Sequence, residues 1–341
     1  MRIAQLAPVA ERVPPKKYGG TERVIYALTE ELVKRGHEVT LFASGDSISS
    51  AKIDSIYPRA LREDNVKDSY GFNNWTTLNI GHAYAMQDKF DIIHDHMAPF
   101  SLPTANISKT PVVMTMHGTF NRSNRQNFKM LNNQGVVTIS NSQIETAHEL
   151  NHLGMVYNGL HMNHYPFGEE SEGYLLYVGR ISPEKGAHHC VRVAKELNAR
   201  LIMAAKLDDQ NRDYFEKEIQ PYLSDRITWV GEVDEEERNK LMARSKALLH
   251  PVVFREPFGL TLIESMACGA PVIAFNRGAI PEIVIHGETG FVVQDEEGMI
   301  DAIEKLDQID RFFCREHALK NFNAQKMADG YEAIYKKLLN K

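Results

Sequence analysis

The chain has 341 residues, of which 43% are hydrophobic and 25% charged, an ordinary globular composition at a length typical of two domains. A formal net charge of −6 argues against general nucleic-acid binding, and three widely spaced cysteines argue against a disulfide framework or a zinc site. No hydrophobic run approaches a membrane span and the first residues are not typical of a signal peptide, so we expect a cytoplasmic protein.

In chain order, short apolar runs alternate with amphipathic stretches. Residues 2–8 predict a strand, and residues 21–36 predict a helix because Val24, Leu28 and Leu32 recur at helical spacing. Further strands of this half are expected at residues 37–43, 91–96, 111–118, 135–140 and 154–159. Such alternation indicates a parallel sheet with helices on both faces.

A polar, turn-rich stretch at residues 161–173 predicts a linker, after which the alternation restarts. Strands are expected at residues 174–179, 199–205, 226–231, 246–252 and 270–275, and helices at about 187–197, 210–222, 234–244, from 259, and at 323–339. The predicted fold class is α/β, with two doubly wound parallel-sheet domains. Because such sheets bind ligands beyond the carboxyl ends of their strands, two facing domains would form a cleft there.

Two cations follow the strand at 174–179. Arg180 and Lys185 lie in a short loop that runs into a helix, whose N-terminus already favours anions. An arginine fork and a lysine point charge at that place predict a phosphate or diphosphate site. The alternative is a solvated loop with two surface cations.

Two carboxylates bracket the start of a helix in the segment EPFGLTLIE. Glu256 precedes that helix, and Glu264 lies about one turn inside it. A carboxylate can accept hydrogen bonds from two hydroxyls, which suits the diol of a ribose or another sugar. The residues between the carboxylates that we expect to present backbone N–H groups are Phe258, Gly259 and Leu260. The alternative is a loop glutamate and an exposed helix glutamate.

In the first half, Gly19 and Gly20 lie at a predicted helix start and would let a ligand approach the backbone. His117 follows a predicted strand and is a candidate hydrogen-bond partner for a substrate, although a structural histidine is the alternative. His94 and Ser140 also lie at strand ends and are candidates on the acceptor side.

The histidines of His94-Asp95-His96 could ligate a metal, but successive residues of a strand point to opposite faces, and we expect no metal. The sequence has no Gly-x-Gly dinucleotide fingerprint, no P-loop, no Asp-x-Asp and no Gly-x-Ser-x-Gly. A dehydrogenase is therefore disfavoured, and no cofactor is expected.

Taken together, these segments resemble the retaining GT-B glycosyltransferases of family GT4, in particular its compact bacterial members. The resemblance rests on EPFGLTLIE, GRISPEKG, PVIAFNRGAIPEIV and HGETGFVV in the second half, and on YGGTE, HDH, MHG, ISNSQ and YNGL in the first. His161 and the pair Arg277-Gly278 depart from the family pattern. The implied domains are residues 1–161 on the acceptor side, joined by a C-terminal helix at about 323–341, and residues 162–322 on the donor side.

The resemblance also implies roles for the candidate residues. Arg180 and Lys185 would bind the donor diphosphate, Glu264 the ribose, and Glu256 the transferred sugar with help from the backbone near Phe258 and Gly259. His117 would contact the donor sugar near the reacting carbon. The residues implied near the diphosphate or the nucleobase are Gly19, Gly20, Gly231, Glu232 and Val233. The catalytic candidates are His117, Glu256, Arg180 and Lys185.

The expected reaction is metal-independent transfer of a sugar from a nucleoside-diphosphate sugar, with UDP-glucose the preferred donor, to a hydroxyl of a sugar or another small molecule. Alternatives on the same fold are a sugar-nucleotide epimerase, a phosphorylase and a non-catalytic sugar-nucleotide-binding protein. Arg122, Arg125 and Lys129 share one helical face and could give a weak membrane-surface contact, although a solvated face is the alternative.

Overall fold

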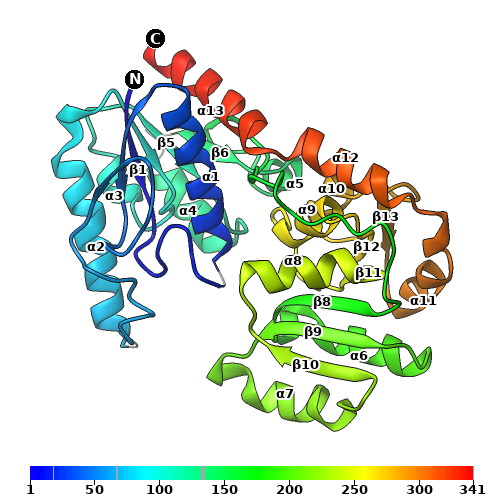
Figure 1. Ribbon diagram of the computed structural model, residues 1–341. Coiled ribbons are helices and arrows are strands. Elements are labelled where there is room, and N and C mark those ends of the chain that lie inside the picture. Colours follow the sequence, from blue (N-terminus) through cyan, green and yellow to red (C-terminus); the bar gives the residue numbers. More distant parts are fainter. Residues whose placement is uncertain (18, 67, 132–134, 341) are drawn as a thin grey trace. The chain divides into compact units, whose positions relative to one another are not determined.

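The structure, a computed structural model, describes residues 1–17, 19–66, 68–131 and 135–340, so Lys341 of the predicted last helix lies outside the described residues. The chain divides into two compact units (Figure 1). Unit 1 comprises Met1–His161 and Asn323–Lys341, and unit 2 comprises Met162–Phe322. Each unit contains one parallel sheet, which confirms the predicted α/β class. In the described ranges, no helix combines the length and the apolar character needed to cross a membrane.

The sheet of unit 1 has the order β3-β2-β1-β4-β5-β6-β7, so the first strand lies near its centre. Its strands are β1 (Arg2–Leu6), β2 (Glu38–Phe42), β3 (Lys52–Asp54), β4 (Ile92–Asp95), β5 (Val112–Thr115), β6 (Gly135–Thr138) and β7 (His152–Met155). Its helices are α1 (Gly20–Lys34), α2 (Ser69–Ala85), α3 (Leu102–Ala105), α4 (Arg122–Met130), α5 (Asn141–Thr146) and α13 (Ala324–Leu339). The chain order reverses between β1 and β4, the place where doubly wound sheets bind ligands.

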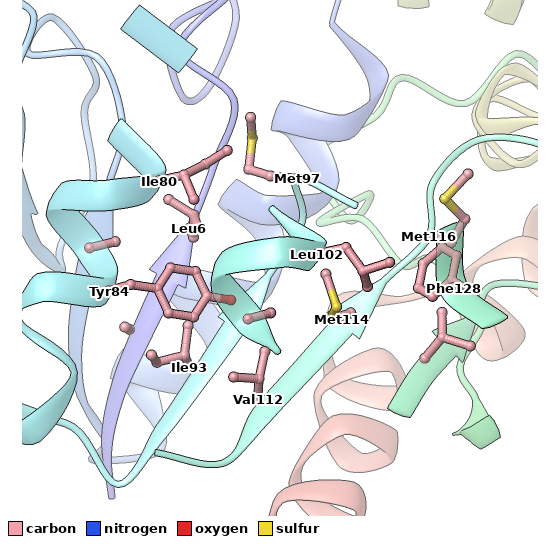
Figure 2. Close-up of a cluster of buried hydrophobic side chains, with 14 of the residues drawn as sticks. Leu6, Ile80, Tyr84, Ile93, Met97, Leu102, Val112, Met114, Met116 and Phe128 are labelled. Carbon is pink, nitrogen blue, oxygen red and sulfur yellow. The ribbon is translucent and has the colours of Figure 1, made fainter. Parts of the chain in front are cut away.

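The side chains of the strands in unit 1 alternate between two faces of the sheet, which differ in polarity. One sheet face packs an apolar cluster from the strands against α2, α3 and α4, in which Leu6 and Ile93 lie beside Tyr84 of α2 and Met114 lies beside Leu102 of α3 (Figure 2). The intervening residues, among them Gln5, point to the other face because successive side chains of a strand alternate. The second face therefore contains polar groups in an otherwise buried strand.

The last helix completes unit 1. α13 packs against α1, and its start is held to the end of the first 161 residues by a bridge between Leu160 and Asn323 (Figure 1). Arg35, just after α1, donates to Asp329 Oδ1 at 2.7 Å. The predicted strand at 154–159 is wrong in its position, since β7 ends at Met155 and the following residues leave the sheet to meet α13.

Unit 2 has the sheet order β10-β9-β8-β11-β12-β13, which reverses between β8 and β11. Its strands are β8 (Leu175–Arg180), β9 (Leu201–Lys206), β10 (Ile227–Gly231), β11 (Ala247–His250), β12 (Val272–Phe275) and β13 (Gly290–Val293). Its helices are α6 (Ala187–Glu196), α7 (Arg212–Glu218), α8 (Glu235–Arg244), α9 (Leu260–Ala267), α10 (Ile280–Ile283), α11 (Glu296–Glu304) and α12 (Arg311–Asn321). The predicted helix at 210–222 is shortened to α7, because Pro221 lacks the N–H needed to continue it.

Candidate functional site

The loops after β8 and β11, on either side of the reversal in unit 2, are held together by backbone contacts. Gly186 has φ +71° at the start of α6, and a Cβ there would collide with the carbonyl oxygen of Pro251. The N–H of Val253 donates to the carbonyl of Glu184 at 3.0 Å. These contacts require glycine at 186 and fix the loop that contains both predicted cations.

Lys185 and Glu256 form a shielded ion pair. Lys185 Nζ lies 3.0 Å from Glu256 Oε2 and 4.6 Å from the centre of the Phe254 ring, and the Glu256 side chain is only 9% exposed. Burial alone would raise the pKa of Glu256, but the neighbouring ammonium of Lys185, the largest opposing influence, outweighs burial and lowers it to about 2. Glu256 is therefore a carboxylate at neutral pH, and a weakly basic one.

His250, at the end of β11, was not identified from the sequence. Its Nε2 lies 3.5 Å from Glu256 Oε2, too long for a strong hydrogen bond. Burial lowers the pKa of His250 despite the neighbouring carboxylate, so the imidazole is neutral at pH 7. Its sequence signal was its position at the end of a buried strand, the same signal that identified Arg180.

Arg180 ends β8 and is partly exposed. Its Nη2 donates to Glu184 Oε1 at 3.0 Å, whereas its buried Nε has no hydrogen-bond partner among the described residues. A buried guanidinium N–H without a partner costs free energy that an anionic ligand can recover. Arg180 and Lys185 thus lie on one loop, each with a carboxylate as its protein partner.

The backbone at the start of α9 leaves no room for a side chain at two glycine positions. Gly259 has φ +92°, and a Cβ there would lie 2.7 Å from Leu262 Cδ1. Leu260 is the first residue of α9, and Phe258 is buried against Phe322. Gly278 has φ +64°, and a Cβ there would collide with the backbone of Glu256, so glycine is required beside the carboxylate as well.

Glu264 is buried inside α9 and accepts a hydrogen bond from Arg238. Arg238 Nη2 lies 2.8 Å from Glu264 Oε1, and the hydroxyl of Tyr165 lies 3.5 Å from the same oxygen. Arg238, on α8, was missed because nothing in its own segment distinguishes it from a surface arginine. Its guanidinium offsets the cost of burying the carboxylate that we expected to meet a ribose.

The predicted nucleobase segment follows β10 directly. Gly231 ends β10 with φ +78°, next to an irregularity in the strand pairing, and Glu232 and Val233 lead into α8. Asp234 caps α8 by accepting from the N–H of Glu237 at 2.9 Å. The turn at 231–233 is thus fixed by a strand end on one side and a helix cap on the other.

In unit 1, the predicted glycines stand at the start of α1. Gly19 has φ +154°, and a Cβ there would lie 2.7 Å from Pro15 Cβ and 3.1 Å from Glu22 Oε2. Gly20 is the first residue of the helix. Burial raises the pKa of Glu22 to about 7, so an acidic side chain that titrates near neutrality lies beside this turn.

His117 is half-buried and contacts a second histidine. His117 Nε2 lies 2.9 Å from His96 Nδ1, and His96 Nε2 lies 2.8 Å from Gln5 Oε1. Burial lowers the pKa of His117 to about 4 and that of His96 well below its ordinary value. Both imidazoles are therefore neutral at pH 7.

The two acceptor-side candidates, His94 and Ser140, lie in the interior of unit 1. His94 is fully buried, with Nδ1 2.6 Å from the hydroxyl of Tyr335 and Nε2 2.8 Å from Thr115 Oγ1. Ser140 is also fully buried and caps α5 by accepting from the N–H of Gln143 at 3.2 Å. Both side chains have hydrogen-bond partners within unit 1.

Asp95 is likewise part of the interior, where it accepts from Tyr84, Ser101 and the N–H of Met97. Within the described ranges, no group of three His, Cys, Asp or Glu side chains could hold a metal ion. On α4, Arg125 and Lys129 lie 3.8 Å and 3.2 Å from Glu149, which offsets part of the basic face considered for membrane contact.

Two family models match the chain. The model described as Glycosyltransferase Family 4 matches residues 18–162, and the one described as Glycosyl transferases group 1 matches residues 166–314. The N-acetyl-alpha-D-glucosaminyl L-malate synthase of Bacillus anthracis is 26% identical to the chain, with 93% of each chain covered.

Solved structures share the fold. AviGT4, a glycosyltransferase of avilamycin A biosynthesis, matches with a TM-score of 0.77 and 23% identity, covering 99% of this chain and 98% of AviGT4. Anabaena HepE, solved in complex with UDP and glucose, matches with a TM-score of 0.75 and 18% identity, covering 99% of this chain and all of HepE. These matches and the two parallel sheets confirm the GT-B fold.

Proposed function

Because this chain belongs to the GT4-type glycosyltransferases of the GT-B fold, we propose that it moves a hexose from a nucleoside-diphosphate sugar to an acceptor hydroxyl, with retention of configuration and without a metal ion. The observation that carries the proposal is the loop of Arg180 and Lys185, locked against the segment of Glu256. The loop presents two fixed cations at the carboxyl edge of the sheet.

The cations suit a diphosphate. The guanidinium of Arg180 has a buried N–H without a protein partner among the described residues, and the ammonium of Lys185 has three donors, of which Glu256 engages one. As the glycosidic bond stretches, negative charge grows on the leaving diphosphate. Cations fixed beforehand stabilise that charge more in the transition state than in the ground state. They supply the role that a divalent metal has in other transferases.

The carboxylates suit hydroxyls rather than the reacting carbon. A glutamate whose pKa is held near 2 by Lys185 is a poor nucleophile and a poor base, so Glu256 is assigned to binding hydroxyls of the transferred sugar. Glu264, oriented by Arg238, is assigned to the ribose. His117, neutral at pH 7, is assigned to a hydroxyl of the donor sugar.

Retention then follows from attack on the face that the diphosphate leaves. The bond from the anomeric carbon to the phosphate oxygen breaks, the bond from that carbon to the acceptor oxygen forms, and the acceptor proton moves to a phosphate oxygen of the departing nucleoside diphosphate. The sugar is oxocarbenium-like between the two events. No side chain of the enzyme forms a covalent intermediate in this scheme.

UDP-glucose is the proposed donor, supported by HepE, a relative in fold solved with UDP and glucose. UDP- and GDP-sugars are screened first by thermal stabilisation, since a ligand at 100 times its dissociation constant adds about 2.7 kcal/mol. Release of nucleoside diphosphate with and without sugar acceptors follows, in the presence of EDTA. Conversion of the donor without an acceptor would indicate an epimerase, and tight binding without release a binding protein.

Arg180→Ala should lower kcat by about 10²–10³, the usual effect of removing one preorganised donor to a developing negative charge. Arg192→Ala is the matched control, because Arg192 lies on the following helix α6 with its ion pairs to Glu218 and Glu296 on the surface. Near wild-type turnover in Arg180→Ala would remove the diphosphate assignment. EDTA-sensitive turnover would remove the metal-free assignment.

A further inference from the structure

A chain of buried polar contacts runs behind His117 to the C-terminal helix, with hydrogen bonds at 2.6–2.9 Å and one long contact of 3.5 Å between Gln5 and His94. In order, it links His117 to His96, His96 to Gln5, Gln5 to His94, and His94 to Tyr335 of α13. The strand period explains the alignment: His94 and His96 lie two residues apart on one face of the sheet. Gln5 of β1 is paired in register with His94, so its amide lies beside both rings.

The structure turns the amide nitrogen of Gln5 toward His94 and its amide oxygen toward His96. His94 Nδ1 lies 2.6 Å from the Tyr335 hydroxyl and 3.5 Å from Gln5 Nε2, and an amide nitrogen can only donate. His94 Nδ1 is therefore the acceptor, and His94 Nε2–H donates to Thr115 Oγ1 at 2.8 Å. With its nitrogen turned toward His94, Gln5 presents its oxygen to His96.

The same reasoning continues outward. Gln5 Oε1 can only accept, so the proton of His96 lies on Nε2, 2.8 Å away. A neutral imidazole has one N–H, and His96 Nδ1 is then an acceptor. The partner of His96 Nδ1 is His117 Nε2, 2.9 Å away, which must carry the proton of His117. That leaves Nδ1 as the accepting nitrogen of His117.

We propose that Gln5 and His96 are positioning residues that hold His117 in its Nε2–H tautomer, so that His117 Nδ1 accepts a hydrogen bond from a hydroxyl of the donor sugar. The sugar hydroxyl as the ligand of His117 rests on the proposed function, whereas the tautomer of His117 is a property of the protein alone. Burial keeps His96 and His117 neutral at pH 7, so each ring has a proton on only one of its two nitrogens. His117 is thereby an acceptor, and it cannot act as a general acid at the sugar.

The test is the protonation of each ring nitrogen, measured by long-range proton–nitrogen NMR on protein labelled with ¹⁵N-histidine at pH 7. The signals of His117 are assigned by their loss in His117→Gln. We expect a protonated Nε2 and an unprotonated Nδ1 in the wild type. In Gln5→Met, which removes the acceptor for His96, we expect His117 to become a mixture of both tautomers.

Tyr84→Phe is the matched control, because it removes a buried 2.6 Å hydrogen bond to Asp95 of the same strand without touching the chain of histidines. It should leave the tautomer of His117 unchanged. In the transfer assay, Gln5→Met should lower kcat/KM by about 10–100-fold, by comparison with the loss of a partner that orients a metal-binding histidine. Tyr84→Phe should change kcat/KM by less than about twofold if the folded fraction is equal.

An Nδ1–H tautomer or an even mixture in the wild type overturns the proposal, as does an unchanged tautomer in folded Gln5→Met. If Gln5→Met does not fold, the wild-type spectrum still decides. Failure of the proposed function has a different signature, in which the spectrum is as expected but no nucleoside diphosphate is released from any donor.

Discussion

The ion pair of Lys185 and Glu256 allows a quantitative test of how strongly two shielded charges interact in the loop after β8. The fall in the pKa of Glu256 from its ordinary 4.5 to about 2 corresponds to about 3 kcal/mol in favour of the folded, ionised state. Lys185 is the main attractive partner, so a double-mutant cycle of Lys185→Met and Glu256→Gln should give a coupling energy of about 2–3 kcal/mol at pH 7. Lys185→Met should be the more damaging single change, because it leaves an unpaired carboxylate on a side chain that is only 9% exposed.

The assay is urea unfolding of unit 2, followed by fluorescence. The chain has two tryptophans, Trp75 on α2 of unit 1 and Trp229 on β10 of unit 2, so a Trp75→Phe background makes Trp229 the reporter. The matched control is the pair Glu236 and Lys240, which is shorter at 2.6 Å but largely exposed. Water screens the charges of the control pair, and no measurable coupling is expected there.

The coupling must also depend on pH with a definite sign. The folded pKa of Glu256 is depressed, so its stabilisation is fully present above about 4.5 and is lost as the pH falls through about 2. At pH 3 the coupling should be less than half its value at pH 7. A coupling below about 0.5 kcal/mol at pH 7, or one independent of pH, would refute the view that this pair is shielded from water.

Two further predictions concern stability. Gly278→Ala should destabilise unit 2 by more than Gly173→Ala does. Gly173 also has positive φ, but a Cβ there would meet no atom within 4 Å, so its substitution should cost only the backbone strain of about 1–2 kcal/mol. Equal losses of stability in urea unfolding would contradict the predicted collision of a Cβ at position 278 with the backbone of Glu256. Because the pKa of Glu22 is raised to about 7, its contribution to stability should be present below about 4.5 and be lost as the pH rises to about 7. The Tm of Glu22→Gln minus that of the wild type should therefore increase between about pH 4.5 and pH 7 and stay constant at higher pH. A Tm difference that does not vary with pH would show that Glu22 is solvated.

The sequence predicted what depends on local pattern. Helix α1 follows from the spacing of Val24, Leu28 and Leu32, and Arg180 and Glu256 were found because buried strands end just before them. β3 was missed because three residues carry too little pattern, and β13 because its short apolar run follows a turn-rich stretch.

The pairings within the candidate site were not predictable in the same way. Glu256 meets Lys185 and Glu264 meets Arg238 only because the sheet order brings β11 and α9 beside β8 and α8. No spacing along the chain encodes these distances. Gln5 did leave a local sign, since it is the one polar residue among the buried residues 3–6 of β1, and a polar side chain buried there must have partners.

The position of α13 affects the order in which the protein can complete its folding. Unit 2 is one continuous run, whereas the first 161 residues lack Tyr335, Asp329 and the rest of α13 until that helix has been synthesised. The unit that leaves the ribosome first is thus the second to be finished, and until then His94 and Arg35 lack partners that they have in the native state. A free chain truncated after residue 323 should therefore hold a native unit 2 and an unfinished unit 1.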